Sequence, residues 1–90
     1  MIYLQVNHTV ADYAKWRPGF DANEPARRAG GATGVQQVYR GMEDPNAITI
    51  LMEWDNAENA RRFFLDPRLK EVMSAAGVIG APESHFLTRT

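Results

Sequence analysis

The stretch Ala47–Phe64, AITILMEWDNAENARRFF, contains the clearest change from strand to helix in the chain. Its first part, AITILMEWD, is rich in β-branched and large apolar residues and reads as a strand that ends in Trp54. Asp55 and Glu58 then have the spacing of a capping box with aspartate as the cap, which predicts that a helix begins directly after the strand. The apolar positions of that helix form one face: Ala57, Ala60, Phe63 and Phe64.

A second strand is predicted just before this one, in residues 34–42, GVQQVYRGM. The connection between the two strands is EDPN, and Asp44, Pro45 and Asn46 each favour a turn. The two segments are therefore expected to form a hairpin.

The N-terminus shows the two-residue period of a strand with one strongly apolar face. Ile2, Leu4 and Val6 alternate with more polar residues, and continuing that alternation places His8 at the end of the apolar face. A shift of one residue in the register would exchange His8 for Asn7 on that face.

A helix is expected next, capped by Thr9 or Asp12. Three aromatic residues share one of its faces, which should be buried: Tyr13, Trp16 and Phe20. Pro18 removes a backbone donor and disfavours helical geometry at the residue before it, so we expect a kink or break around residues 16–19. The helix should then resume toward Arg28 and stop at Gly30–Gly31.

The C-terminal third is predicted to add one more helix and one more strand. Asp66 and Pro67 look like a cap followed by proline at the first helical position, and Gly77 ends the helix. Its inward positions are expected to be apolar: Leu69, Val72, Met73 and Ala76. After a connection of small residues, 83–89 is predicted to be the last strand, with Phe86 and Leu87 as its apolar residues.

The resulting order, β-α-β-β-α-β, predicts an α+β fold of the ferredoxin-like type, with a four-stranded antiparallel sheet and the helices on one of its faces. Residues 1–90 are expected to form a single domain. The strands also carry apolar residues toward the other face, such as Leu51 beside Ile50 and Leu87 beside Phe86. One layer of helices can bury only one face, so we expect a second copy of the chain to cover the other and form a homodimer.

Composition excludes several classes of function. Ten Lys and Arg residues against eleven Asp and Glu residues give a formal net charge of −1, which argues against a nucleic acid or a membrane surface as partner. The absence of cysteine excludes disulfides and thiolate chemistry and fits a cytoplasmic protein. No stretch approaches the roughly 20 apolar residues of a membrane-spanning helix. The chain also lacks phosphate-loop, nucleophile-elbow and dinucleotide motifs, so no cofactor is expected.

At the level of motifs, the whole chain resembles the dimeric α/β-barrel proteins of the antibiotic-biosynthesis-monooxygenase type. The segments that carry the resemblance are VNHTVADYAKWRPGFD, the strand ILMEWD followed at once by AENARRFF, and DPRLKEVMSAAGV. The resemblance implies a homodimer whose sheets close into a barrel, with a ligand cleft between sheet and helices in each protomer. It does not imply one reaction, because this fold supports many.

Two kinds of chemistry can be compared with that resemblance. Heme-degrading relatives use an asparagine, a tryptophan and a histidine; Asn7 matches the first, but the other two positions fall on Phe63 and Met73, which disfavours heme degradation. Cofactor-free oxygenases of this type use a small polar set near a quinol substrate. The resemblance suggests four residues of suitable type for that set: Asn7, Tyr39, Arg40 and Trp54.

His8 is the strongest candidate for catalysis, because a neutral imidazole at the mouth of an apolar cleft can accept or donate a proton near neutral pH. Candidate substrate-binding residues are Asn7, Tyr13, Trp16, Tyr39, Arg40, Trp54 and Phe63. His85, on the last strand, is expected to be structural or exposed, and no metal site is expected from two histidines without cysteine. The pairs Arg27–Arg28 and Arg61–Arg62 are expected to lie on solvated helix surface.

Three readings of function stay open at this point. The chain is either a cofactor-independent oxygenase, lyase or isomerase that uses His8 on a small aromatic substrate, or a non-catalytic or stress-related dimer that binds a small hydrophobic molecule. The third reading is a purely structural dimer whose aromatic residues fill a closed core.

Overall fold

The computed structural model describes all 90 residues. The elements along the chain are β1 (Ile2–Val10), α1 (Tyr13–Ala22), α2 (Glu24–Gly30), β2 (Ala32–Arg40), β3 (Ala47–Trp54), α3 (Ala57–Phe64), α4 (Pro67–Ala75) and β4 (Val78–Thr88). None of the helices is both long and apolar enough to span a membrane.

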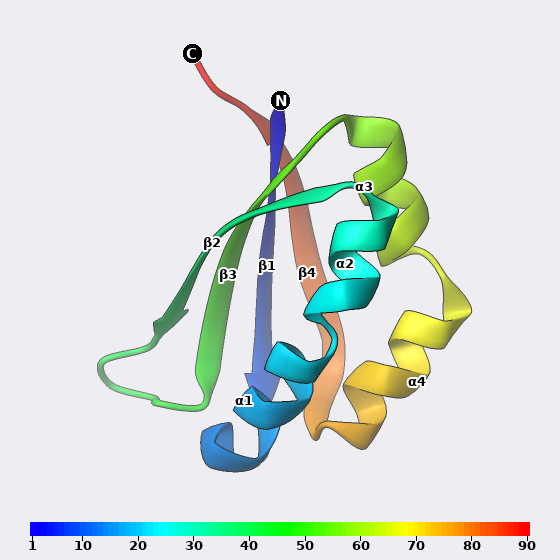
Figure 1. Cartoon of the computed structure of the whole chain (residues 1–90). Coiled ribbons are helices and arrows are strands. Elements are labelled where there is room, and N and C mark those ends of the chain that lie inside the picture. The colour runs from blue at the N-terminus through cyan, green and yellow to red at the C-terminus, as the bar shows by residue number, and fades with distance from the viewer.

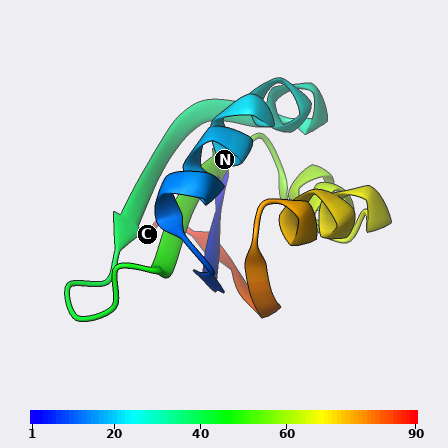
Figure 2. The same cartoon turned by 90° about the horizontal axis from the view of Figure 1, so that it is seen from below.

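The four strands form one antiparallel sheet in the order β2-β3-β1-β4, and all four helices lie on one face of it (Figure 1). Seen from below, α1 and α2 form one group over the sheet and α3 and α4 form another (Figure 2). This arrangement confirms the predicted ferredoxin-like α+β fold, and each helical segment consists of two helices, as the expected break in the first segment and the expected new start at Asp66 indicated.

The core lies between the helices and the two central strands. Alternate residues of β1 and β3 face it and are buried: Leu4, Val6, His8, Val10, Ile48, Ile50, Met52 and Trp54. The strands are in register, since Leu4 pairs with Met52 and His8 with Ile48. Trp16 and Phe20 of α1 and Ala60 of α3 complete the core, as their periodicity predicted. We call this side of the sheet the covered face.

The break in the first helix does not lie where it was predicted. α1 continues through Pro18 as far as Ala22, and the chain turns at Asn23 before α2, which has Pro25 in its first turn. The prediction was wrong because packing outweighs local preference: Trp16 and Phe20, on either side of the proline, are both buried in the core. α2 ends at the predicted place, with Gly31 in a positive-φ conformation (φ 125°).

The bounds of three strands also differ from the sequence prediction, and β2 spans Ala32–Arg40 rather than residues 34–42. β1 continues past His8 to Val10, and β4 begins at Val78 rather than Glu83, because Val78 and Ile79 pair with Val10 and Thr9. The register shifts between Asn7 and Thr9, opposite a segment that contains a glycine and a proline. Those two residues gave this part of the strand the appearance of a loop.

The caps of the last two helices were predicted with mixed success. Asp66 caps α4 by accepting a hydrogen bond from the backbone N–H of Arg68 at 2.9 Å, as expected. The cap of α3 is Asn56, not Asp55: the Asn56 side chain accepts from the backbone N–H of Asn59 at 2.8 Å. Asp55 instead accepts from the backbone N–H of Asn56 at 2.7 Å.

α4 covers the sheet less closely than α1. None of its residues is fully buried, and Val72, which the sequence placed inward, is 41% exposed. Leu69 and Met73 are half-buried. The helix layer is therefore tight over one half of the sheet and loose over the other.

The second face of the sheet has no covering layer in the protomer, and we call it the open face. Its central side chains form a network of hydrogen bonds. Tyr3 Oη and Thr33 Oγ1 both donate to the Glu53 carboxylate, at 3.0 and 2.9 Å, and Thr49 Oγ1 donates to Asn7 Oδ1 at 2.9 Å. Leu51 is half-buried on this face, and Leu87 at its edge is 39% exposed.

Candidate functional site

An inner pocket lies between the covered face of the sheet and the helices. It is lined by 16 residues, of which 12 are hydrophobic. Its floor comes from alternate residues of two strands: Leu4, Val6, His8, Ile50 and Met52. Its aromatic walls come from α1 and α3: Trp16, Phe20, Phe63 and Phe64. The space open to water inside it is about 60 Å³.

His8 is the imidazole of this pocket. Its side chain is 7% exposed, and its ring meets that of Trp16 edge to face, with centroids 5.4 Å apart. Nδ1 is buried and has no hydrogen-bond partner. Burial lowers the pKa of His8 from its ordinary value of 6.5, and the residue's own backbone opposes this shift only in part. At neutral pH the ring is therefore a neutral, unpaired base beside an apolar space.

Arg27 is the residue that the sequence analysis placed wrongly. It was expected on solvated surface, yet it is 4% exposed and lines the inner pocket. Nη1 donates to the backbone oxygen of Phe20 at 2.9 Å, and the guanidinium carbon lies 3.9 Å from the centre of the Phe20 ring. Nη2 is buried without a partner. Desolvation lowers the pKa of Arg27 below its usual range, although arginine stays protonated in proteins.

A sequence signal for Arg27 does exist. Tyr13, Trp16 and Phe20 follow the helical period, and the same spacing continues through Asn23 to Arg27 despite the break between α1 and α2. Asn23 and Arg27 both line the pocket. The predicted break at Pro18 hid this continuity.

Of the residues predicted from the sequence, the structure brings three together in the inner pocket: His8, Trp16 and Phe63. Trp54 lies behind that group, fully buried, with its ring centre 5.2 Å from that of Phe63, and it does not line the pocket. Its Nε1 has no hydrogen-bond partner.

Tyr13 and Arg40 form a separate pair next to the hairpin. The guanidinium carbon of Arg40 lies 4.0 Å from the centre of the Tyr13 ring, and its Nε donates to the backbone oxygen of Pro45 at 3.0 Å. Tyr13 contacts Trp16, with ring centres 5.9 Å apart, but neither Tyr13 nor Arg40 lines the inner pocket.

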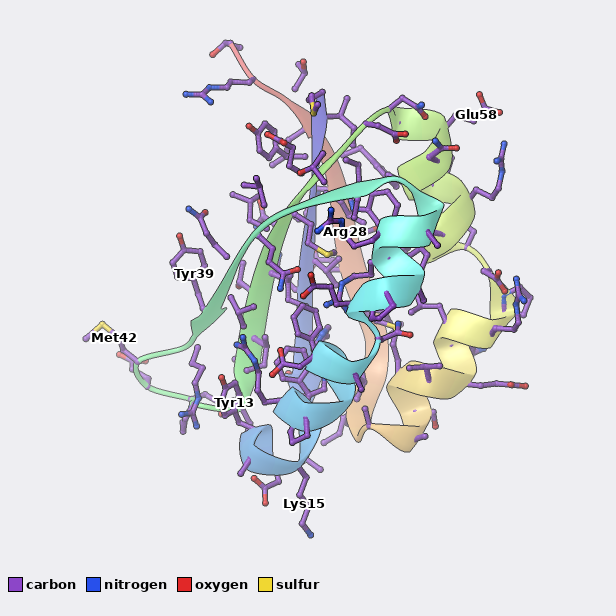
Figure 3. The ribbon with its side chains drawn as sticks, in the orientation of Figure 1. Tyr13, Lys15, Arg28, Tyr39, Met42 and Glu58 are labelled. Carbon is purple, nitrogen blue, oxygen red and sulfur yellow. The ribbon has the colours of Figure 1, made fainter.

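Asn7 and Tyr39 lie on the open face, so they are not placed with His8. Successive residues of a strand point to opposite faces, which puts Asn7 opposite its neighbour His8. Tyr39 pairs with Thr49 and points away from the helices (Figure 3). The polar set suggested by the resemblance is thus divided between two faces of the sheet.

A larger outer groove of about 810 Å³ runs between α2 and the α3–α4 pair. It shares four lining residues with the inner pocket: Asn23, Phe63, Leu69 and Val72. Three arginines also line the groove: Arg28, Arg62 and Arg68. The groove therefore leads to the inner pocket past charged side chains of both signs, since Asp55 and Asp66 line it beside the arginines. Only Leu69 and Val72 of the shared residues belong to the loosely packed α4.

Metal ligands do not converge anywhere in the structure: no group of three or more His, Cys, Asp or Glu side chains could hold a metal ion. The ionisable side chains of the inner pocket are His8 and Arg27 alone. The arrangement can therefore offer one base and one cation to a small molecule with an apolar body.

Comparison with solved structures shows which known proteins share this fold. The chain is similar to an antibiotic-biosynthesis-monooxygenase-like protein from Bordetella bronchiseptica, with 20% identity, a TM-score of 0.80, and coverage of 99% of this chain and 96% of the other. It is similar to SnoaB, a cofactor-independent oxygenase from Streptomyces nogalater, with 16% identity, a TM-score of 0.76, and coverage of 99% and 92%.

A third similar structure is the monooxygenase ActVA-Orf6 of Streptomyces coelicolor in complex with nanaomycin D, with 21% identity, a TM-score of 0.67, and coverage of 99% and 87%. No protein-family model and no curated protein sequence matches the chain. The fold is that of the antibiotic-biosynthesis-monooxygenase structures, as the sequence resemblance implied.

Proposed function

We propose that this chain binds a small aromatic molecule in the inner pocket and acts on it as a cofactor-independent oxygenase, with His8 as the proton-transfer group. The observation that carries the proposal is the buried, unpaired Nδ1 of His8 beside Trp16 in an otherwise apolar pocket. A buried polar atom without a partner is rare in folded proteins, and such atoms concentrate at functional sites.

The reaction we propose is the oxidation of a phenol that carries hydrogen at the para carbon. Neutral His8 accepts the phenolic proton, and the resulting carbanion character lets the para carbon form a bond to O₂. Protonation of the peroxide by the imidazolium restores neutral His8. Loss of water from this hydroperoxide then breaks the O–O and C–H bonds and leaves a quinone, so that one phenol and one O₂ give one quinone and one H₂O.

The comparisons support this choice among reactions. SnoaB is described as a cofactor-independent oxygenase, and ActVA-Orf6 as a monooxygenase seen with nanaomycin D. A pocket with Trp16, Phe20 and Phe63 in its walls suits a ligand that contains an aromatic ring. Asn7 and Arg40, which the resemblance suggested for the polar set near the substrate, are not part of the proposal, because neither lines the pocket.

Entry of such a ligand requires the pocket to open. Its volume of about 60 Å³ is less than half of the roughly 150 Å³ cavity that accepts benzene in a model protein. α4 is the wall we expect to move, because it has no fully buried residue, and its Leu69, Val72 and Met73 line the pocket.

We also propose that the protein is a homodimer formed through the open face. That face has no covering layer in the protomer, although Leu51 and Leu87 lie on it. A dimer would leave the inner pocket of each protomer on the outer side of the sheet. A monomeric mass by light scattering at micromolar concentration would contradict this.

The catalytic proposal is tested with His8→Ala against a panel of phenols that carry hydrogen at the para carbon, following O₂ consumption and quinone absorbance. We expect turnover to fall by about 100-fold or more, the range for loss of a general base. His85→Ala is the matched control, since His85 lies on the open face and is half exposed, and its turnover should stay within about twofold. Unchanged turnover in His8→Ala would remove the proposed base.

A second candidate function is a non-catalytic dimer that binds a small hydrophobic molecule. The observation that favours it is the separation of Asn7 and Tyr39 from His8 by the thickness of the sheet. This alternative predicts a ligand-dependent rise in melting temperature with no turnover and little sensitivity to His8→Ala.

A further inference from the structure

The unpaired guanidinium of Arg27 is the most unusual group in the inner pocket. A cation that is 4% exposed normally faces a carboxylate, yet Arg27 forms none of the salt bridges in the structure. Asp21 and Glu24 lie close enough only to act on it through space. Its single hydrogen bond goes to the neutral backbone oxygen of Phe20.

The position of Arg27 is fixed by its neighbours. Nη1 of the guanidinium donates to the Phe20 oxygen at 2.9 Å, and the guanidinium carbon lies over the Phe20 ring, 3.9 Å from its centre. These contacts leave Nη2 as the free donor, buried among the apolar side chains that line the pocket. A donor held in this way is pre-organised for an acceptor that the protein itself does not supply.

We propose that Arg27 Nη2 is the binding site for an ionised oxygen, carboxylate or phenolate, on an aromatic ligand of the inner pocket. This inference rests on the proposed ligand-binding function of the pocket, but it is independent of whether the ligand reacts. In a site with little water a charge-assisted hydrogen bond to arginine is stronger than one between neutral groups. The ligand's oxygen would satisfy both the buried charge and the orphaned donor.

The outer groove does not by itself select an anion. Two carboxylates line it, those of Asp55 and Asp66, beside three arginines: Arg28, Arg62 and Arg68. Each of these three has a carboxylate neighbour on its own segment, at 4.0, 2.9 and 2.8 Å, and their side chains are more than half exposed. They therefore differ from Arg27, whose charge has no such partner, and they provide matched controls.

The test compares three single-ring probes by titration calorimetry: 4-nitrobenzoate, 4-nitrophenol and the neutral 4-nitrobenzyl alcohol. The wild-type protein is expected to bind the two anion-forming probes at least about tenfold more tightly than the alcohol. The visible absorption of 4-nitrophenolate shows whether the bound phenol is ionised. A preference for the benzoate alone would assign the subsite to carboxylic acids, and an ionised bound phenol would assign it to phenolates.

Three variants isolate the contribution of Arg27. Arg27→Met keeps the apolar stem and removes the charge, so it should bind the alcohol as the wild type does and lose the preference for anions. Arg28→Met, one residue along α2, should keep that preference within about twofold, because an exposed ion pair contributes little. Arg27→Lys keeps the charge without the planar fork and should retain part of the preference.

The melting temperature distinguishes binding from a structural role. Removal of an unpaired buried charge should leave the melting temperature of Arg27→Met unchanged or higher. A lower melting temperature together with weaker binding of all three probes would show that Arg27 only supports the fold, and would overturn the proposal. Should Arg27→Met not fold, Arg27→Lys decides the question: binding of both anions as tight as in the wild type would overturn it.

Failure of this inference can be told apart from failure of the proposed function. Equal binding of the three probes by the wild type would overturn the anion subsite and leave the pocket as a ligand site. Binding of none at millimolar concentration would overturn both. Anion preference without turnover of para-unsubstituted phenols would support the subsite and favour the non-catalytic function.

Discussion

The two faces of the sheet treat polar groups in opposite ways. On the open face, where water is near, the polar side chains of the central strands are paired: Glu53 accepts from Tyr3 and Thr33, and Asn7 accepts from Thr49. On the covered side, three side-chain atoms are buried with no partner: His8 Nδ1, Arg27 Nη2 and Trp54 Nε1.

This difference is the reverse of what stability alone would favour. An unpaired polar group costs more in an apolar interior than at a wet surface, by about 1–3 kcal/mol for each group. Two of the three unpaired atoms belong to residues that line the inner pocket. A ligand bound there would offset the free-energy cost of leaving these atoms unpaired. The covered side is therefore both the core and the candidate site, whereas the open face is a candidate interface.

The largest change in the free energy of unfolding is expected when a buried side chain on the covered face is shortened. Ile50→Ala should lower the free energy of unfolding by about 2–5 kcal/mol, because Ile50 is 3% exposed and its loss leaves a cavity. Leu51→Ala, the next residue on β3 but on the open face, should cost about 1 kcal/mol in dilute protein. Urea denaturation at two protein concentrations measures both.

The dependence of the unfolding free energy on protein concentration distinguishes these two variants further. If a second copy covers the open face, the loss for Leu51→Ala grows with protein concentration, while that for Ile50→Ala does not. Equal losses at both concentrations would contradict the proposed distinction between core and interface.

The same two faces explain how much of the fold could be predicted from the sequence. The alternation of Leu4, Val6 and His8 assigned a strand and its buried side correctly, and the run AITILMEW assigned a strand. Pro18 and the glycine and proline near the start of β4 misled the prediction, because a helix and a strand held by packing and pairing tolerate residues that are unfavourable locally.

The candidate site was predicted only in part. His8, Trp16 and Phe63 could be placed because each follows a simple period within one element. Arg27 was missed because a charged residue beside a second arginine normally indicates solvent, and because the break expected at Pro18 hid the helical spacing that leads from Phe20 to Arg27. Asn7 was grouped with His8 by residue type. The side chains of adjacent residues in a strand point to opposite faces of the sheet, however, so Asn7 and His8 are separated.

A smaller effect is expected from a charge placed on the open face. Leu51→Lys should raise the dissociation constant of the proposed dimer by about tenfold or more, equivalent to about 1.4 kcal/mol, because the lysine would be desolvated in the interface. Light scattering over a dilution series measures the shift. Leu65→Lys is the control, since Leu65 is 69% exposed next to the helices and should leave the mass unchanged. A loss of dimer in both variants would place the interface elsewhere.

The smallest effect should distinguish the two histidines, one on each face. The folded-state pKa of His8 is lowered by burial from its ordinary value of 6.5, so the unfolded chain binds a proton more readily than the folded one. The stability linked to His8 is fully present above the ordinary pKa of 6.5. It is lost as pH falls from there toward the folded-state pKa. From about pH 8 to about pH 6 the loss should be no more than about 1 kcal/mol.

His8→Gln should therefore flatten the pH dependence of the unfolding free energy in this interval, and His85→Gln, on the open face, should keep it. Arg27 is the other ionisable side chain of the pocket and stays protonated throughout, so it adds a constant charge but no slope. Urea denaturation at several pH values measures the difference. A slope that disappears in His85→Gln and persists in His8→Gln would mean that the open face, and not the pocket, carries the titrating group.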